Sequence, residues 1–200
     1  MIIWLASYPR SGNTFLRVVL NSVFDVRTYS IYDDRTDIGA DNRLSEVVGH
    51  EFLPDGFDLE QARRSDKLYF IKTHDGPAQS LDDKVIYLLR DGRASTLSFR
   101  RYLMDYQDHP VSLRDLIRGR HSFGTWGQHV SAWNPAGRKN TLLVRFEELI
   151  ADPFAVVDAV VAFTGLRPVS TEIPSFEELH EKGPRFFRSG KTDAWKSEYS

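Results

Sequence analysis

The first two dozen residues constrain the fold more than any other part of the chain. Residues 2–7 (IIWLAS) form a short apolar run that predicts a buried strand. A loop at residues 8–13 (YPRSGN) separates this run from residues 14–24, where apolar side chains recur with helical spacing. A loop between a strand and a helix directs backbone N–H groups and the positive end of the helix dipole toward one point. The sequence therefore predicts an anion site here, of the kind that most often binds phosphate.

The loop resembles a Walker A loop, G-x-x-x-x-G-K-[ST], with two differences. The first glycine of that pattern is missing, and the residue after Gly12 is Asn13 instead of lysine. Thr14 stands at the Walker serine or threonine position, Ser11 adds a polar donor, and Arg10 is the nearby cation. The loop is therefore predicted to bind phosphate without ordinary magnesium–nucleotide chemistry. Taken alone, it also fits a plain strand-to-helix turn in which Gly12 supplies backbone freedom.

The rest of the chain alternates strand and helix patterns. Two hundred residues with 41% hydrophobic content can form one domain with a hydrophobic core. We expect further strands at 67–73, 84–89 and 141–146, and helices at about 93–104, 126–133 and 153–164. This order predicts an α/β fold, a single domain over residues 1–200 with a parallel β-sheet flanked by helices and a P-loop-like loop after strand 1. Ligands bind at the carboxyl ends of such strands, so the loops at 8–13, 74–78 and 90–93 share the candidate site.

Composition excludes several classes of protein. A formal net charge of −2 gives no general reason to expect nucleic acid or an anionic membrane as partner. The chain has no cysteine, which excludes disulfides, thiolate catalysis and cysteine-ligated metals and fits a reducing compartment. The sequence shows no signal peptide and no run that approaches the length of a membrane span. We therefore expect a cytoplasmic protein, and its oligomeric state is left open.

Two further pairs of residues are candidates for chemistry. Lys72 and His74 end the second long strand, and His74 is a candidate general base because an imidazole accepts a proton near neutral pH. Lys72 lies on the same side of a regular strand as His74. Arg90 ends the third long strand, and Ser98 follows eight residues later in a helix, so both can converge on one extra phosphate. A solvated strand end and surface arginines beside a helix cap also explain these residues.

In sequence order, these motifs resemble those of the sulfotransferases that use 3′-phosphoadenosine 5′-phosphosulfate (PAPS). That family has a phosphosulfate loop close to Y-P-K-S-G-T-T-W, which is similar to residues 8–15 (YPRSGNTF). Its Lys-Thr-His triplet and its Arg with a Ser eight residues later are also present. Further segments of the family, Tyr-Glu-Asp-Leu, a Ser-Phe pair and R-K-G-x-x-G-D-W-K, are similar to residues 146–149, 175–176 and 188–196. The resemblance covers nearly the whole chain.

The resemblance implies in-line transfer of a sulfuryl group from PAPS to a hydroxyl or amine of a small-molecule or carbohydrate acceptor. The product nucleotide is adenosine 3′,5′-bisphosphate (PAP), and no metal is required. The implied catalytic residues are His74, Lys72 and Arg10. The implied donor-binding residues are Arg10, Ser11, Gly12, Asn13, Thr14, Phe15, Arg90, Ser98, Ser175, Phe176, Arg188, Ser189 and Gly190. Residues 27–66 and 100–135 are expected on the acceptor side, and residues 184–200 as a tail that covers the donor.

The chain departs from the family pattern at three positions. Arg10 replaces lysine, Phe15 replaces tryptophan and Ser189 replaces lysine. Two alternatives therefore stay open. A P-loop nucleotide kinase or NTPase needs a metal site, and the missing lysine after Gly12 argues against it. A nucleotide-binding module without catalysis is favoured by the changes at Arg10 and Ser189. The acceptor is not readable, although aromatic walls are available from Tyr102, Tyr106, Phe123, Trp126 and Trp133, which core packing also explains.

Overall fold

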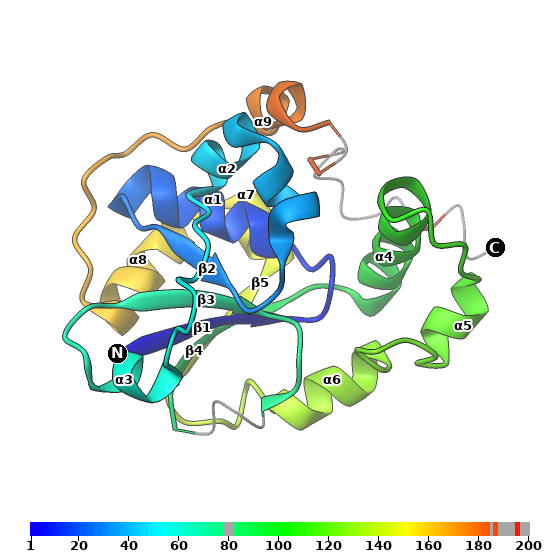
Figure 1. Cartoon of the computed structure of the whole chain (residues 1–200), viewed down its shortest axis with the longest axis horizontal. Coiled ribbons are helices and arrows are strands. Elements are labelled where there is room, and N and C mark those ends of the chain that lie inside the picture. The colour runs from blue at the N-terminus through cyan, green and yellow to red at the C-terminus, as the bar shows by residue number, and fades with distance from the viewer. Residues whose placement is uncertain (78–81, 185, 188–194, 197–200) are drawn as a thin grey trace.

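A parallel sheet organises the molecule (Figure 1). The computed structural model describes residues 1–77, 82–184, 186–187 and 195–196. Within these residues, five strands are arranged in the order β2-β3-β1-β4-β5, and every neighbouring pair is parallel. The strands are β1 (Ile2–Ser7), β2 (Thr28–Ser30), β3 (Tyr69–Thr73), β4 (Lys84–Leu89) and β5 (Thr141–Arg145). The predicted α/β fold with a parallel sheet and a loop after strand 1 is confirmed.

The central strand β1 is buried on both faces. Ile3 and Leu5 belong to the hydrophobic core on one face, and Ile2 and Trp4 belong to the core on the other. A strand covered on both faces has no polar side, which explains why the sequence shows a continuous apolar run. Its carboxyl end therefore leads directly from the core to the edge of the sheet where the neighbouring parallel strands also end.

Helices cover both faces of the sheet (Figure 1). The larger layer contains α1 (Asn13–Phe24), α2 (Asn42–Val48), α7 (Phe146–Ala151), α8 (Pro153–Thr164) and α9 (Phe176–Lys182). The opposite layer contains α3 (Leu59–Arg64) and α6 (Trp126–Trp133). Beyond the carboxyl ends of the strands lie α4 (Gly92–Tyr106) and α5 (Leu113–Ile117) (Figure 1). This arrangement leaves one end of the sheet to be covered by loops and by α4.

Several predicted boundaries are confirmed. The strands at 2–7 and 84–89 and the helix at 126–133 have the expected bounds. The helix at 153–164 is capped by Asp152, whose carboxylate accepts hydrogen bonds from the N–H groups of Phe154 and Ala155. Gly165 ends it with a φ of 78°, a left-handed conformation that glycine adopts without strain.

The differences lie in short elements. The polar segment 27–66 contains the edge strand β2, which three residues are too few to reveal by periodicity. The same segment contains two 3₁₀ turns, η1 (Asp34–Thr36) and η2 (Ile38–Ala40). The segment after α8 contains a further short helix, α9, which begins with a capping box between Ser175 and Glu178. The strand expected at 67–73 begins at Tyr69.

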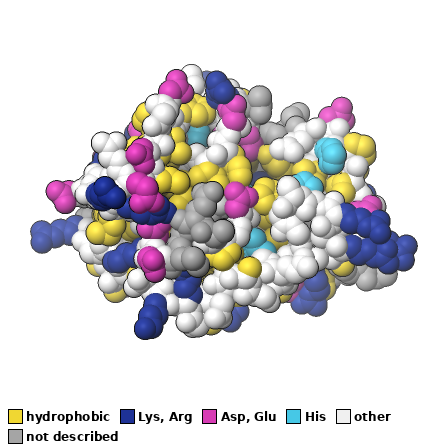
Figure 2. Space-filling view, turned by 60° about the horizontal axis from the view of Figure 1, so that its bottom comes forward, with side chains coloured by type: hydrophobic (Ala, Val, Ile, Leu, Met, Phe, Trp, Pro, Cys, Tyr) yellow, Lys and Arg dark blue, Asp and Glu magenta, His cyan; other side chains and the backbone are white. Residues whose placement is uncertain are grey.

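Charged side chains of both signs are spread over the surface in Figure 2. Lys and Arg side chains gather at the end of this face where α5 lies (Figure 2). The exposed arginines in and directly after α5 are Arg114, Arg118 and Arg120. In the described part of the chain, no helix combines the length and the apolar character needed to cross a bilayer.

Candidate active site

A cavity of about 500 Å³ lies at the carboxyl edge of the sheet. Its walls come from the loop after β1, the first turn of α1, the end of β3 and the inner side of α4. Further wall comes from the segment after β2 (Tyr32, Asp33, Asp34, Asp37 and Ile38) and from residues 121–123. The volume falls within the roughly 300–1,000 Å³ that small-molecule sites occupy. The loops at the ends of β1, β3 and β4 therefore do meet at one site, as the sequence predicts.

The loop after β1 has the backbone of a tight anion-binding turn. Arg10 and Gly12 both have positive φ angles, 62° and 99°. A Cβ on Gly12 would overlap the ring of Phe146, so only glycine fits this position. The N–H groups of Phe15 and Leu16 donate to the Gly12 carbonyl, which closes the first turn of α1. The N–H groups that precede them in that turn are the ones that a helix leaves without an internal acceptor.

The side chains of Ser11 and Asn13 hold this loop in place. Ser11 is buried, and its hydroxyl lies 3.3 Å from the Ser95 hydroxyl on α4. Asn13 Nδ2 donates to the Leu5 carbonyl at 2.9 Å and to the Ser7 hydroxyl at 3.3 Å. Asn13 lines the cavity, whereas the Ser11 side chain is turned into the protein. Their predicted contact with a donor stays a prediction.

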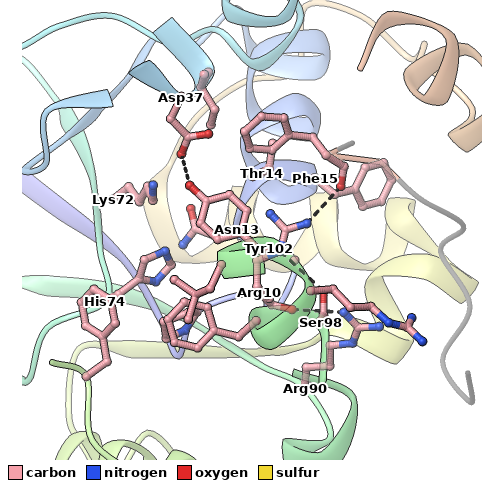
Figure 3. A pocket seen from close by; sticks show the side chains of 18 of the residues that line it. Arg10, Asn13, Thr14, Phe15, Asp37, Lys72, His74, Arg90, Ser98 and Tyr102 are labelled. Carbon is pink, nitrogen blue, oxygen red and sulfur yellow. Dashed lines mark hydrogen bonds between the residues drawn. The ribbon is translucent and has the colours of Figure 1, made fainter. Parts of the chain in front are cut away.

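Arg10 reaches across the cavity (Figure 3). Its Nε donates to the Ser98 hydroxyl at 3.5 Å, and its Nη2 donates to the Phe186 carbonyl at 3.2 Å. The guanidinium lies 5.1 Å from the centre of the Tyr102 ring. The resemblance implied two roles for Arg10, one with Lys72 and His74 and one with the donor-binding residues, and the structure places its guanidinium beside Ser98.

Arg90 and Ser98 line the same part of the cavity, on the side opposite Lys72 and His74 (Figure 3). The Arg90 guanidinium packs 4.2 Å from the centre of the Phe146 ring, and its Nη1 donates to the Arg10 carbonyl at 3.1 Å. Burial lowers the pKa of Arg90 to about 10, so the group stays charged at neutral pH. The pair that the sequence separates by eight residues is therefore brought together at one end of the site.

His74 is held in one tautomer. Its Nδ1 lies 2.7 Å from the Ser7 carbonyl, which only accepts hydrogen bonds, so Nδ1 carries the proton and Nε2 carries the lone pair. Its backbone N–H donates to the Tyr32 hydroxyl at 2.8 Å, and the two rings stack with an interplanar angle of 17°. Burial, and then the charge of Lys72, hold the pKa of His74 well below 6.5. His74 is therefore a neutral base at neutral pH.

Lys72 lies beside His74, as the strand periodicity predicts (Figure 3). Its side chain is buried, with Nζ 3.6 Å from the Asp34 carboxylate and 5.5 Å from the centre of the Tyr32 ring. Burial lowers the pKa of Lys72, and the negative charge of Asp34 opposes that shift. Sequence reasoning missed Tyr32 and Asp34. They follow the carboxyl end of β2, a strand of three residues that gives no periodic signal in the sequence.

Of the aromatic residues considered for the acceptor pocket, some line the cavity and others pack behind it. Tyr102 and Phe123 line the cavity, and the Tyr102 hydroxyl donates to Asp37 at 2.8 Å. Trp126 Nε1 donates to the Arg90 carbonyl at 3.1 Å, and the buried Trp133 Nε1 donates to the Asp75 carbonyl at 2.9 Å. These two tryptophans fix loops behind the site. The side chain of Tyr106 lies outside the described part.

The C-terminal segment contributes further wall. The rings of Phe15 and Phe176 lie 4.7 Å apart, and both line the cavity together with Phe186, Phe187 and Trp195. Ser175 caps α9 by accepting from the Glu178 N–H, so its hydroxyl is used within the helix. Arg188, Ser189 and Gly190 lie outside the described residues. The expectation that the tail covers the donor therefore remains a prediction.

Among the described residues, no group of three or more His, Asp or Glu side chains is arranged to hold a metal ion. The cations that line the cavity are instead arginine and lysine side chains (Figure 3).

Comparison with known proteins identifies the family. The sulfotransferase domain family matches residues 2–199. Mouse sulfotransferase 4A1 is 24% identical over 193 residues, which cover 90% of this chain and 65% of the mouse protein. Human sulfotransferase 2B1 is 26% identical over 85% of this chain and 47% of its own length. The chain thus spans 65% of the length of the mouse relative and 47% of the length of the human one.

A solved structure shows the same fold. The crystal structure of mouse sulfotransferase SULT7A1 complexed with PAP covers 100% of this chain and 78% of its own, with a TM-score of 0.71 and 22% identity. Because the family match extends over almost every residue, the chain belongs to the sulfotransferase domain family.

Proposed function

We propose that this protein transfers the sulfuryl group of PAPS to a hydroxyl or amine of a small-molecule or carbohydrate acceptor. The observation that carries this proposal is the division of the cavity. A neutral histidine of fixed tautomer and a buried lysine lie on one side, and an arginine and a serine lie on the other (Figure 3). The mouse relative that shares the fold was solved with PAP, which supports a nucleotide of this kind as ligand.

The donor subsites follow from the walls. The first turn of α1, at Gly12 to Thr14, suits the 5′-phosphate because helix N-termini bind anions. Arg90 and Ser98 suit the 3′-phosphate, since a guanidinium grips phosphate with two N–H groups and a hydroxyl adds a third donor. The rings of Phe15 and Phe176 offer apolar surface for a purine.

The chemistry then assigns a role to each side chain. The acceptor hydroxyl gives its proton to His74 Nε2 while its oxygen forms a bond to sulfur. At the same time, the bond between sulfur and the bridging phosphate oxygen breaks, and the electron pair leaves with PAP. Lys72 stabilises the charge on the transferring group as a preorganised cation. Arg10 joins it if its guanidinium leaves Ser98 when the donor binds.

We assign the acceptor to the wall beside His74. Residues from 27–66, such as Tyr32, and from 100–135, such as Phe123, line the cavity near His74. The ring of Phe123 meets the His74 ring edge-to-face at 5.8 Å. This wall is aromatic next to His74 and acidic at Asp34 and Asp37, so it suits an acceptor with both apolar and hydrogen-bonding groups.

A nucleotide-binding module without catalysis is the second candidate. The contact of Arg10 with Ser98 favours it, because this contact places the loop cation away from Lys72 and His74. The two candidates predict the same affinity for PAP and different turnover.

One experiment tests both. The protein is incubated with PAPS and a panel of phenols, alcohols, amines and sugars in EDTA, and PAP release is measured by chromatography. We expect acceptor-dependent PAP release that His74→Ala reduces without weakening PAP binding. PAP binding with no acceptor-dependent release from any class would favour the binding module.

A further inference from the structure

We propose that Asp34 is a positioning residue for the transfer reaction, whose carboxylate keeps the Lys72 ammonium charged and in place beside His74. The proposal rests on the proposed function for its catalytic meaning. Its structural content, a carboxylate that controls a buried lysine, can be tested separately.

Asp33, which caps η1, and Asp34, its first residue, have opposite environments. The Asp33 side chain is 61% exposed and pairs with Arg35 at 2.7 Å in solvent. The Asp34 side chain is 5% exposed, and its carboxylate lies 3.6 Å from Lys72 Nζ. A buried carboxylate is costly unless a cation compensates it, so the fold places Asp34 where its charge has a partner.

Lys72 retains unused donors in this arrangement. Among the described residues, Lys72 Nζ pairs with the Asp34 carboxylate at 3.6 Å, which is an ion pair beyond hydrogen-bond distance. An ammonium has three N–H donors, and Lys72 lines the cavity next to His74. The remaining N–H groups are thus available to an anionic group in the cavity, while Asp34 anchors the ammonium from behind.

A second buried cation makes this anchor more necessary. Arg17 on α1 is fully buried; its Nε donates to the Thr28 hydroxyl at 2.7 Å, and its Nη2 lies 2.8 Å from His50 Nδ1. Burial lowers the pKa of Arg17 to about 10, and the charge of Asp34 is the largest influence that opposes this shift. Asp34 therefore compensates two buried cations that repel each other.

The titratable and charged groups that influence Lys72 come from every element packed around it. They are Asp34 in η1, Asp37 between η1 and η2, Arg17 on α1, His50 after α2, Tyr32 after β2 and His74 after β3. Asp34 and Asp37 are the two carboxyl groups in this set; burial raises the pKa of Asp37, which also accepts a hydrogen bond from the Tyr102 hydroxyl. Removing the Asp34 charge leaves Lys72 beside Arg17 with its direct counterion gone.

The sign of the effect follows from charge. A negative neighbour favours the protonated form of a lysine, so replacing Asp34 by the isosteric asparagine lowers the proton affinity of Lys72. A lysine that loses its proton no longer stabilises anionic charge. The alkaline limb of the rate profile in Asp34→Asn should therefore move to lower pH.

The direct test is a ¹³C NMR titration of the lysine side chains in Asp34→Asn, Asp34→Glu and the wild type. Lys72→Arg identifies the Lys72 resonance. The matched control is Asp158→Asn, which makes the same change at an exposed position on α8. We expect Asp34→Asn to lower the proton affinity of Lys72 about tenfold or more, since one pKa unit is a modest shift for a buried ion pair. Asp34→Glu should recover part of the loss, and Asp158→Asn should change nothing.

The proposal would be overturned if the proton affinity of Lys72 in Asp34→Asn, taken from the titration midpoint, stayed within twofold of the wild-type value. Circular dichroism shows whether Asp34→Asn folds. If it does not, the titration of the folded Asp34→Glu variant decides between the two outcomes, because a displaced carboxylate must still shift the titration midpoint of Lys72 measurably. Calorimetry with PAP separates this question from the proposed function. If the wild type does not bind PAP, the proposed donor site is wrong. The lysine titration still reports on Asp34 in that case.

The catalytic arm uses p-nitrophenyl sulfate as sulfuryl donor to PAP and follows p-nitrophenolate. We expect the alkaline limb of kcat to move to lower pH in Asp34→Asn by the same factor as the NMR midpoint, with the KM for PAP unchanged. A uniform loss of kcat at every pH would show a merely structural role and would also overturn the proposal.

Discussion

The two sides of the cavity are formed by different kinds of secondary structure. The side with Arg90 and Ser98 is formed by regular elements, the carboxyl end of β4 and the first half of α4, and the charges that line it are positive. The side with Lys72 and His74 is completed by 3₁₀ turns and loops, and there cations and carboxylates are mixed. The first side suits tight recognition of phosphate. The second suits proton transfer, which needs a neutral base next to a charged lysine.

The largest effect should come from His74→Ala, which removes the base from the side of the cavity with Lys72 and His74, which we call the mixed-charge side. We expect a loss of about 10²–10⁴-fold in kcat, the usual contribution of a positioned general base. PAP affinity should be unchanged, because the variant leaves intact the side with Arg90 and Ser98, which we call the phosphate side. Steady-state kinetics and calorimetry measure the two quantities. Retention of near-full turnover would remove His74 from its assigned role.

The phosphate side should be sensitive to its backbone. Gly12→Ala introduces a Cβ that overlaps the Phe146 ring at a residue with φ of 99°, so we expect the free energy of unfolding to fall by about 3 kcal/mol. Gly127→Ala in α6 is the control, because nothing lies within 4 Å of its added Cβ. Urea unfolding compares the two. Equal stability of both variants would contradict the tight turn.

Acid should lower the free energy of unfolding, because the protein buries neutral histidines. Burial lowers the pKa of His129 to about 4, below its unfolded value near 6.5. The unfolded state therefore binds more protons between these values, so stability is full above pH 6.5 and falls as pH drops toward 4. The loss is up to about 3 kcal/mol for this residue. His129→Gln should flatten the dependence of unfolding free energy on pH. An unchanged slope would contradict a buried neutral His129.

A smaller effect is expected from Arg90→Ala. A hydrogen bond to a charged group contributes about 1.5–3 kcal/mol, so PAP affinity should fall roughly 10- to 100-fold. AMP, which lacks the 3′-phosphate, should bind about as well as before. Arg64→Ala, an exposed arginine at the end of α3, is the control. If AMP and PAP lose affinity equally, Arg90 does not distinguish the 3′-phosphate.

The same contrast explains how much the sequence could predict. The phosphate side follows strong signals, because buried strands lead into loops with glycine and arginine at fixed spacing. β1, β4 and the loop around Gly12 were therefore predictable, and so was the pairing of Arg90 with Ser98 in space. The path of Arg10 toward Ser98 was not, since it depends on a backbone turn with positive φ.

The mixed-charge side left no such signal. Tyr32 and Asp34 follow a strand of three residues, and their burial depends on contacts with β3 and α1 that are distant in sequence. Asp33 and Asp34 are alike in sequence, and only the tertiary structure separates the exposed one from the buried one. Charge compensation around Lys72 is therefore a property of the fold and not of a motif.

Calorimetry of PAP against AMP and ADP, first without metal and then with Mg²⁺, tests the central claim most directly. The account predicts a strong preference for PAP that does not depend on metal, because Arg90 and Ser98 would bind the 3′-phosphate. Equal binding of PAP and AMP, or nucleotide binding that requires Mg²⁺, would contradict the sulfuryl-transfer site described here.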